Sequence, residues 1–119
     1  MLGRSRTASA LLVASTISAQ AGFFTGNELH NLCTSSPGFA QGYVIGVADL
    51  TDLNVGVIDQ ATGKPVVPNK FICIPEGVVA QQVTDIACKY LEDHPENRQS
   101  PAPILVYQAL LAAWRCPQQ

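Results

Sequence analysis

Residues 76–94 read EGVVAQQVTDIACKYLEDH and show the clearest helical pattern in this chain. Apolar side chains recur every three or four residues and form one stripe, while most polar side chains fall on the opposite side. The stripe consists of Val79, Val83, Ile86, Ala87, Tyr90 and Leu91. We expect His94 to end the helix, because the residue before a proline disfavours helical backbone. The segment predicts an amphipathic helix that packs one face against other helices.

Three further helices are predicted around this segment. Residues 23–33 contain Thr25 and Glu28 at the spacing of a capping box. Residues 39–60 repeat apolar side chains at helical spacing, and residues 101–115 begin with a proline, which is favoured in a first turn. The expected inward side chains are Leu29, Leu32 and Cys33 in the first helix, Phe39, Tyr43, Val44, Val47, Ala48, Leu50 and Asn54 in the second, and Ile104, Leu105, Tyr107, Gln108, Leu111 and Trp114 in the last. The pattern predicts a compact all-α domain of four to five helices.

Residues 39–60 leave alternatives open. Gly42 and Gly46 lie one helical turn apart, and glycine inside a helix costs about 1 kcal/mol relative to alanine. We therefore expect a neighbouring helix to approach this face closely, with Asp49 beside it bonding a neighbouring backbone. Strands are the competing interpretation, because residues 43–47 and 55–58 are β-branched and punctuated by glycine. A loop at 61–70, with the turn sequence TGKP at 62–65, and a short extended piece at 71–74 follow.

The first 21 residues have the order of a secretory signal peptide. Arg4 and Arg6 give a basic start, residues 8–17 form an apolar run, and Ala-Gln-Ala at 19–21 supplies the cleavage pattern. The apolar run is too short to span a bilayer, which needs about 20 residues. The mature chain is expected to comprise residues 22–119 as one domain outside the cytosol.

All four cysteines follow the cleavage pattern, at Cys33, Cys73, Cys88 and Cys116. In an oxidising compartment they predict two structural disulfides, and three connectivities remain open. Their spacing lacks the paired hook of a zinc site, so neither a metal nor another cofactor is expected. Loss of Arg4 and Arg6 changes the formal net charge from −2 to −4. This mildly acidic balance argues against nucleic acid or a membrane surface as a partner.

Catalytic chemistry is poorly supported, so we expect no enzyme. His30 and Cys33 have a spacing at which a nucleophilic dyad is conceivable, but export opposes the reduced thiol that it needs. Asp49, Asp52 and Asp59 do not have the spacing of a calcium loop. The better candidates for a binding surface are the loop at 61–70 and the charged segment at 92–98, because binding residues favour ordered loops. The candidate partner-binding residues are Lys64, Asn69, Lys70, Glu92, Asp93, Glu96 and Arg98.

Several motifs occur in a specific order along the mature chain. They are FTGN at 24–27 with Leu29 and Cys33, GYVIGVAD at 42–49, FICIPEGV at 71–78, Gln82, KYL at 89–91, HPE at 94–96, AL at 109–110 and WRC at 114–116. Together they resemble the Rap/Tai family of immunity proteins over nearly all of residues 22–119. Within these motifs Gly42, Tyr43, Gly46, Asp49 and Pro75 are interpreted as structural positions.

The resemblance implies a small, exported, mostly helical protein without enzymatic activity. Characterised members are periplasmic immunity proteins of type VI secretion systems. They bind a peptidoglycan amidase effector and occlude its cleft, and some form homodimers. The resemblance also implies the disulfide pairs Cys73–Cys116 and Cys33–Cys88. The family commonly has a cysteine at the position of Ala40, which pairs with the one at Cys33, so that local bridge is replaced here.

A periplasmic structural or acid-stress chaperone-like protein is the alternative hypothesis. Such chaperones have similar size and helical content and also carry signal peptides and disulfides. Two histidines and nine carboxylates give this chain limited sensitivity to pH. The motifs around Tyr43 and Pro75 do not favour the chaperone class, so an immunity protein is the preferred hypothesis.

Overall fold

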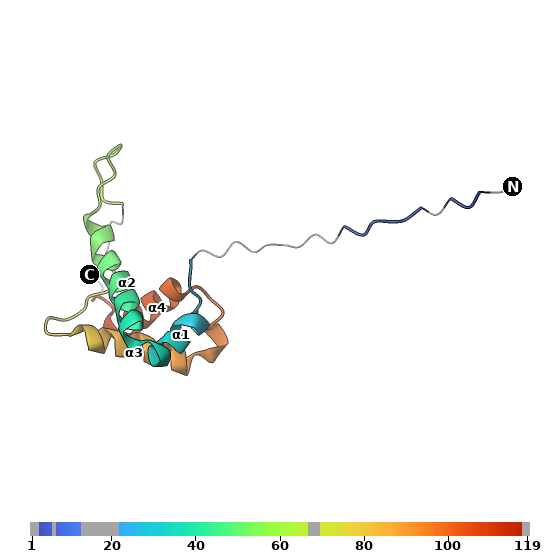
Figure 1. The fold of residues 1–119 in the computed structure, drawn as a ribbon. Coiled ribbons are helices and arrows are strands. Elements are labelled where there is room, and N and C mark those ends of the chain that lie inside the picture. Colours follow the sequence, from blue (N-terminus) through green and yellow to red (C-terminus); the bar gives the residue numbers. More distant parts are fainter. Residues whose placement is uncertain (1–2, 6, 13–21, 67–69, 118–119) are drawn as a thin grey trace.

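The computed structural model describes residues 3–5, 7–12, 22–66 and 70–117 (Figure 1). The described helices are α1 (Gly26–Ser35), α2 (Pro37–Gly56), α3 (Ala80–Asp93), the 3-10 helix η1 (Pro95–Asn97) and α4 (Ala102–Trp114). Within these ranges the extended pairs are three isolated bridges rather than a sheet. None of the described helices is long and apolar enough to cross a membrane. The predicted all-α domain of four to five helices, stapled by disulfides, is confirmed.

The start of α1 follows from its capping box. The backbone N–H of Glu28 donates to Thr25 Oγ1 at 3.3 Å, and the backbone N–H of Thr25 donates to Glu28 Oε2 at 2.7 Å. The helix ends at Ser35, and after Ser36 the chain enters α2 with Pro37 in its first position. One residue between two helices forces a sharp corner, which fixes the direction of the long helix α2 (Figure 1).

Helix α3 begins four residues later than the sequence predicted. Gly77 has φ +83°, a left-handed conformation that favours glycine and interrupts helical backbone. Val79 is extended and caps the helix, and its N–H donates to Gln82 Oε1 at 2.9 Å. Val79 is therefore outside the buried stripe, which consists of Val83, Thr84, Ala87 and Leu91. His94 ends α3 as predicted.

The core lies between all four α-helices, and its composition corrects the predicted faces of α2 and α4. The buried positions of α2 are Ala40, Val44 and Ala48, of which Val44 and Ala48 were predicted to face inward. Phe39 and Leu50, also predicted to face inward, are each 50 % exposed. In α4 the buried residues are Ala102, Leu105, Val106, Ala109 and Leu110, whereas Ile104 is 49 % exposed. Both helices are apolar on most sides, so the sequence pattern did not single out the inward side.

The predicted close approach at Gly42 and Gly46 is wrong for the isolated chain. A Cβ atom added at either position would meet nothing within 4 Å. The glycine that permits close packing is Gly26 at the start of α1. A Cβ there would contact Leu105 Cδ1, and it would lie 2.8 Å from the carbonyl oxygen of Arg98. This contact holds α1 against α4 and the turn after η1.

Two alanine substitutions should therefore have opposite effects. We expect Gly26→Ala to lower the free energy of unfolding by about 1–3 kcal/mol, because the new methyl group overpacks a contact made partly by backbone. Gly42→Ala should raise that of the monomer by about 0.5–1 kcal/mol, because in the single chain the exposed helical site has room for the methyl group. Urea unfolding of the oxidised protein measures both. Equal effects would contradict the packing described for α1.

Candidate functional site

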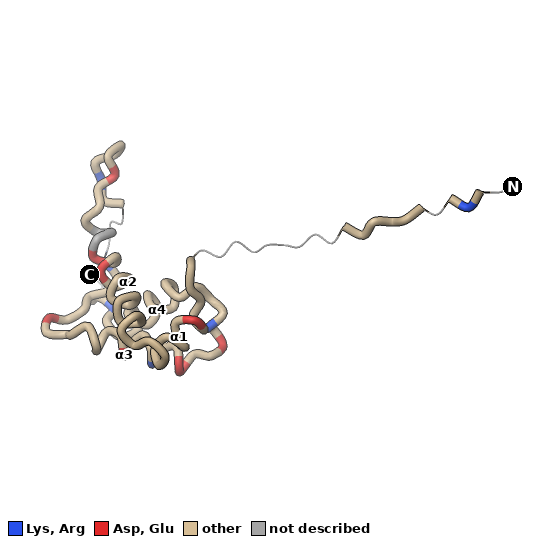
Figure 2. Tube along the Cα trace, viewed as in Figure 1, with Lys and Arg blue, Asp and Glu red and all other residues tan. Residues whose placement is uncertain are grey.

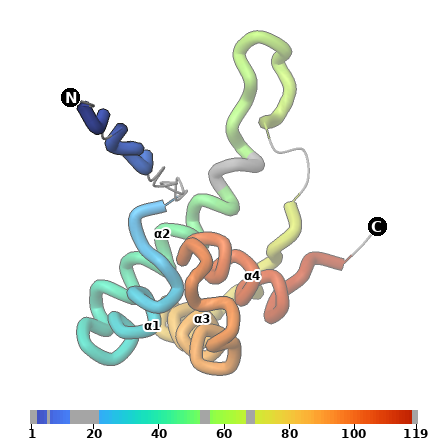
Figure 3. Tube along the Cα trace, turned by 90° about the vertical axis from the view of Figure 1, so that its right-hand side faces the viewer, coloured from blue at the N-terminus to red at the C-terminus, as the bar shows by residue number. Residues whose placement is uncertain are grey.

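The connection between α2 and α3 forms a hairpin, here residues 57–66, that projects from the helical body (Figures 1 and 3). The N–H of Val66 donates to the carbonyl of Val57 at 2.8 Å, and the N–H of Asp59 donates to the carbonyl of Lys64 at 2.8 Å. Ile58 and Pro65 form an antiparallel bridge between these bonds. The hairpin is thus an ordered projection with paired sides.

The tip of the hairpin is the predicted turn sequence. Asp59 accepts from Ala61 N–H through its side chain and from Gly63 N–H through its backbone carbonyl, each at 2.8 Å. Gly63 has φ +68°, which a larger residue rarely adopts. These bonds pre-form the loop and leave Lys64 exposed at its end. Val57, Ile58 and Val66 are also exposed along the sides. The exposed side chain of Asp59 adds a carboxylate near Lys64. A projecting surface that combines apolar sides with one cation and one anion is suited to contact another protein.

The hairpin returns to the body through residues 70–75, here called the return segment. Lys70 Nζ pairs with Asp52 Oδ1 of α2 at 2.6 Å, and the side chain of Ile72 enters the core with 2 % exposure. The N–H of Cys73 donates to the carbonyl of Trp114 at 2.8 Å, and the N–H of Cys116 donates to the carbonyl of Phe71 at 2.9 Å. A disulfide joins Cys73 to Cys116. The return segment is therefore fastened to the end of α4.

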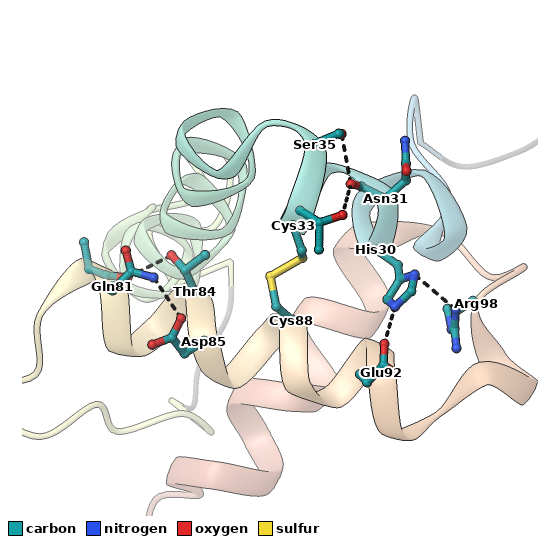
Figure 4. Close-up of a disulfide and its surroundings, with 12 residues drawn as sticks. His30, Asn31, Cys33, Ser35, Gln81, Thr84, Asp85, Cys88, Glu92 and Arg98 are labelled. Atoms are coloured by element: carbon teal, nitrogen blue, oxygen red, sulfur yellow. Dashed lines mark hydrogen bonds and ion pairs between the residues drawn. A yellow bond between two sulfur atoms is a disulfide. The ribbon is translucent and has the colours of Figure 1, made fainter.

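The second disulfide joins Cys33 of α1 to Cys88 of α3 (Figure 4). The two cysteines are separated by 55 positions, so the bond encloses α2 and the hairpin. A loop of this length contributes about 4 kcal/mol in the chain-entropy model, and often less in practice. Both disulfide pairs implied by the family resemblance are thus present in the structure.

A polar network connects α1, α3 and the residue after η1 beside this disulfide (Figure 4). His30 Nε2 lies 2.5 Å from Glu92 Oε2, and Arg98 donates from a terminal nitrogen to His30 Nδ1 at 3.1 Å. The arginine guanidinium can only donate hydrogen bonds, so Nδ1 of His30 accepts from it. Nε2 then carries the hydrogen that is donated to Glu92. The hydrogen bond from His30 lowers the pKa of Glu92 from its ordinary value of 4.5. The network holds the chain near η1 against α1.

The two candidate binding segments lie at different ends of the molecule. Lys64 and Lys70 belong to the hairpin and the return segment, whereas residues 92–98 surround η1, and charged residues are visible at both ends (Figure 2). Asn69 lies outside the described residues, as does the cleavage pattern at 19–21. The structure brings Lys70 to Asp52 and does not bring it to the η1 end.

Much of the η1 end is occupied by internal contacts. Glu92 binds His30, and Asp93 pairs with Lys89 at 2.8 Å along α3. The carbonyl of Arg98 accepts from the N–H of Asn27 at 2.7 Å, which satisfies one of the free donors at the start of α1. Glu96 is exposed. These contacts make residues 92–98 a structural junction as well as a charged surface.

The motif positions divide into packed and exposed residues. Tyr43 packs edge-on against Phe24, with ring centroids 5.5 Å apart, and burial raises the pKa of its hydroxyl. Pro75 accepts from the N–H of Val78 at 3.4 Å in the turn before α3. Asp49 is exposed, and in the described part of the chain its side chain makes no hydrogen bond, so the predicted backbone contact is not observed.

Two features of the site were missed from the sequence. The sequence placed His30 only beside Cys33, in a poorly supported dyad, whereas its partners in the structure lie 62 and 68 positions away. The paired sides of the hairpin were also missed, although apolar pairs on either side of a glycine turn signal a hairpin. Among the described residues, no group of three or more His, Cys, Asp or Glu side chains could hold a metal ion.

A protein-family model matches most of the chain. The model described as "Rap1a immunity proteins" matches residues 25–116, which include all four helices, the hairpin and both disulfides. Neither a curated protein nor a solved structure matches the chain.

The Glu92–His30 contact predicts a pH dependence with a definite sign. Because the folded pKa of Glu92 is lowered, its contribution to stability is complete above pH 4.5 and is lost as the pH falls through the folded value. Glu92→Gln should therefore be less stable than the wild type near pH 6 and equally stable once Glu92 is protonated. Chemical unfolding across this pH range measures the difference. Glu96→Gln is the matched control, and an equal loss in that variant would contradict the assignment.

Proposed function

Because the chain belongs to the Rap1a immunity protein family, we propose that it is a periplasmic immunity protein of a type VI secretion system. It binds a peptidoglycan amidase effector, occludes the catalytic cleft and has no enzymatic activity of its own. The observation that carries this proposal is the family match over residues 25–116. The signal-like order of residues 1–21 supports export, and the pair of disulfides suits an oxidising compartment.

The hairpin is the surface that we assign to the effector. Catalytic sites are concave, and a narrow projection can enter one. Its tip is already hydrogen bonded in the free protein, so binding orders few additional residues. Val57, Ile58 and Val66 present apolar side chains that can be buried on contact. At the η1 end, in contrast, Glu92 and Asp93 already have partners within this chain.

The net charge of the mature chain also fits an effector as the partner. Without Arg4 and Arg6 the formal net charge is −4, so the mature protein attracts a basic effector over long range. This attraction speeds association and weakens with added salt, while the contacts of the hairpin determine dissociation.

The homodimer implied by the resemblance also belongs to this proposal. The outward side of α2 carries Phe39 and Leu50, each half exposed, with Gly42 and Gly46 between them. In an antiparallel pair of α2 helices, the glycines would face each other and each Phe39 would face Leu50 of the other copy. Asp49 would then approach the start of the other α2, whose first turn holds no acidic residue of its own.

Capture of an effector tests the main proposal. Residues 22–119, oxidised and tagged, should recover a stoichiometric amidase from lysates of close relatives and abolish its hydrolysis of peptidoglycan. Absence of a specific partner, together with protection of many unrelated proteins from aggregation at acid pH, would replace the immunity function with that of a chaperone.

The position of the inhibitory surface is tested with two matched variants. Val66 in the hairpin and Val79 before α3 are both 58 % exposed. Val66→Asp should weaken inhibition of the captured amidase at least tenfold, or about 1.4 kcal/mol, because a carboxylate would be buried at the interface. Val79→Asp should leave inhibition unchanged, since aspartate is also a favourable helix cap. Equal inhibition by both variants would place the contact elsewhere.

The homodimer is tested by sedimentation. Phe39→Glu should convert a dimer to a monomer, because two charges would be buried in the α2 contact. Ile104→Glu, at a site of nearly equal exposure on α4, is the control and should remain dimeric. A wild-type protein that is monomeric at high concentration would exclude this pairing.

A further inference from the structure

We propose that the Cys73–Cys116 disulfide holds the hairpin in position only while it is oxidised, and we call this bond the fastener. It differs in role from the Cys33–Cys88 disulfide, which stabilises the helical core. Reduction of Cys73–Cys116 releases the return segment while the four helices stay folded. The consequence for effector binding rests on the proposed function, whereas the release itself does not.

The first argument is the way in which the hairpin is attached. One side of it continues directly from α2, whose preceding turns pack in the core through Val44 and Ala48. The other side continues into the return segment, which is non-helical and lies against the equally non-helical end of the chain after Trp114. Two backbone hydrogen bonds connect these segments, and the disulfide is their covalent link. The fixed position of the second side therefore depends strongly on the Cys73–Cys116 bond.

The remaining attachments of the return segment are weaker constraints. The Lys70–Asp52 ion pair is solvent-exposed, and such pairs contribute little to stability. Ile72 is buried, and the half-buried Ile74 also packs against the core. A short segment held by two apolar side chains and two hydrogen bonds can open locally without global unfolding.

The second argument is the difference in access to the two disulfides. Cys73 is exposed, and its partner Cys116 is half-buried. Cys33 and Cys88 are both half-buried, and Cys33 packs against the apolar core between α1 and α3. Thiol–disulfide exchange requires a thiolate to reach a sulfur atom, so the Cys73–Cys116 bond is the one that a small dithiol attacks first.

The chemical step is an exchange with a dithiol as the reductant. One thiolate of the dithiol attacks Cys73 Sγ, and Cys116 leaves as a thiolate that takes up a proton. The second thiolate of the dithiol then attacks the mixed disulfide, which releases Cys73 as a thiolate and leaves the dithiol oxidised to its own disulfide. Two electrons pass to the protein, and both cysteines end as thiols.

The two bonds therefore have separate consequences. Helices α1 and α3 pack on each other and on α2 and α4 independently of Cys33–Cys88, so loss of that bond reduces stability without changing the arrangement. Loss of Cys73–Cys116 changes the position of the hairpin. Before export, in a reducing compartment, the chain lacks the fastener, and effector binding is confined to the oxidised form.

Graded reduction tests the release without any effector. The oxidised protein is titrated with dithiothreitol, and samples are alkylated for mass spectrometry and measured by hydrogen exchange. Cys73 and Cys116 should be alkylated first, with faster exchange in residues 70–75 and 114–117 and unchanged protection in α1 and α3. Simultaneous alkylation of all four cysteines, or earlier alkylation of Cys33 and Cys88, would overturn the inference.

Paired variants test the consequence for binding. Cys73→Ala with Cys116→Ala should keep the helical circular dichroism of the wild type and weaken inhibition of the captured amidase at least tenfold. Cys33→Ala with Cys88→Ala should lower the unfolding midpoint and, below it, inhibit like the wild type. Undiminished inhibition by the first variant would overturn the inference and leave the immunity function intact. If the wild type binds no amidase, the proposed function fails, and the order of alkylation still decides whether the fastener exists.

Discussion

The anchoring of α1 is the constraint on which the rest of the structure depends. A helix of ten residues is marginal by itself, because nucleation outweighs the few bonds that follow. Three interactions fix it here: the capping box at Thr25, the donation of its first N–H groups to carbonyls near η1, and the bond from Cys33 to α3. Since one residue separates α1 from α2, fixing α1 also fixes the direction of α2, from which the first side of the hairpin continues.

The polar network at His30 reinforces the same anchor. Glu92 and Arg98 approach the imidazole from α3 and from the turn after η1, so three segments meet at one side chain. Their charges are largely satisfied within the chain. The hairpin, whose apolar sides are exposed and whose tip is already ordered, is therefore the better surface for a partner. Rigidity at one end of the molecule and a projecting surface at the other suit the proposed inhibition by occlusion, because a pre-ordered surface loses little conformational entropy on binding.

Local sequence signals predicted most of the helices, and tertiary contacts determined what those signals could not. The capping box at Thr25 and the proline at His94–Pro95 act within one helical turn, so their effects were readable from sequence. The start of α3 was misplaced because apolar spacing continues through Gly77, whose left-handed backbone the pattern does not reveal. The inward side of α2 was predicted only in part, because the helix is apolar on most sides. Val44 and Ala48 are buried as expected, whereas Phe39 and Leu50 are half exposed. The partners of His30 are distant in sequence and follow from the fold alone.

The resemblance described above implies a family cysteine at the position of Ala40, which this chain lacks. A cysteine at the position of Ala40 would bridge to Cys33 across the corner between α1 and α2, closing a loop of about 8 residues worth about 2.5 kcal/mol in the chain-entropy model. Here Ala40 is fully buried, and Cys33 instead bonds Cys88 across 55 positions, where the same model gives about 4 kcal/mol. This difference in cysteine position replaces a short-range disulfide with one that encloses α2 and the hairpin. The Cys33–Cys88 bond stabilises the core separately from Cys73–Cys116, so the more exposed bond, which we propose as the fastener, can be reduced while the helices stay folded.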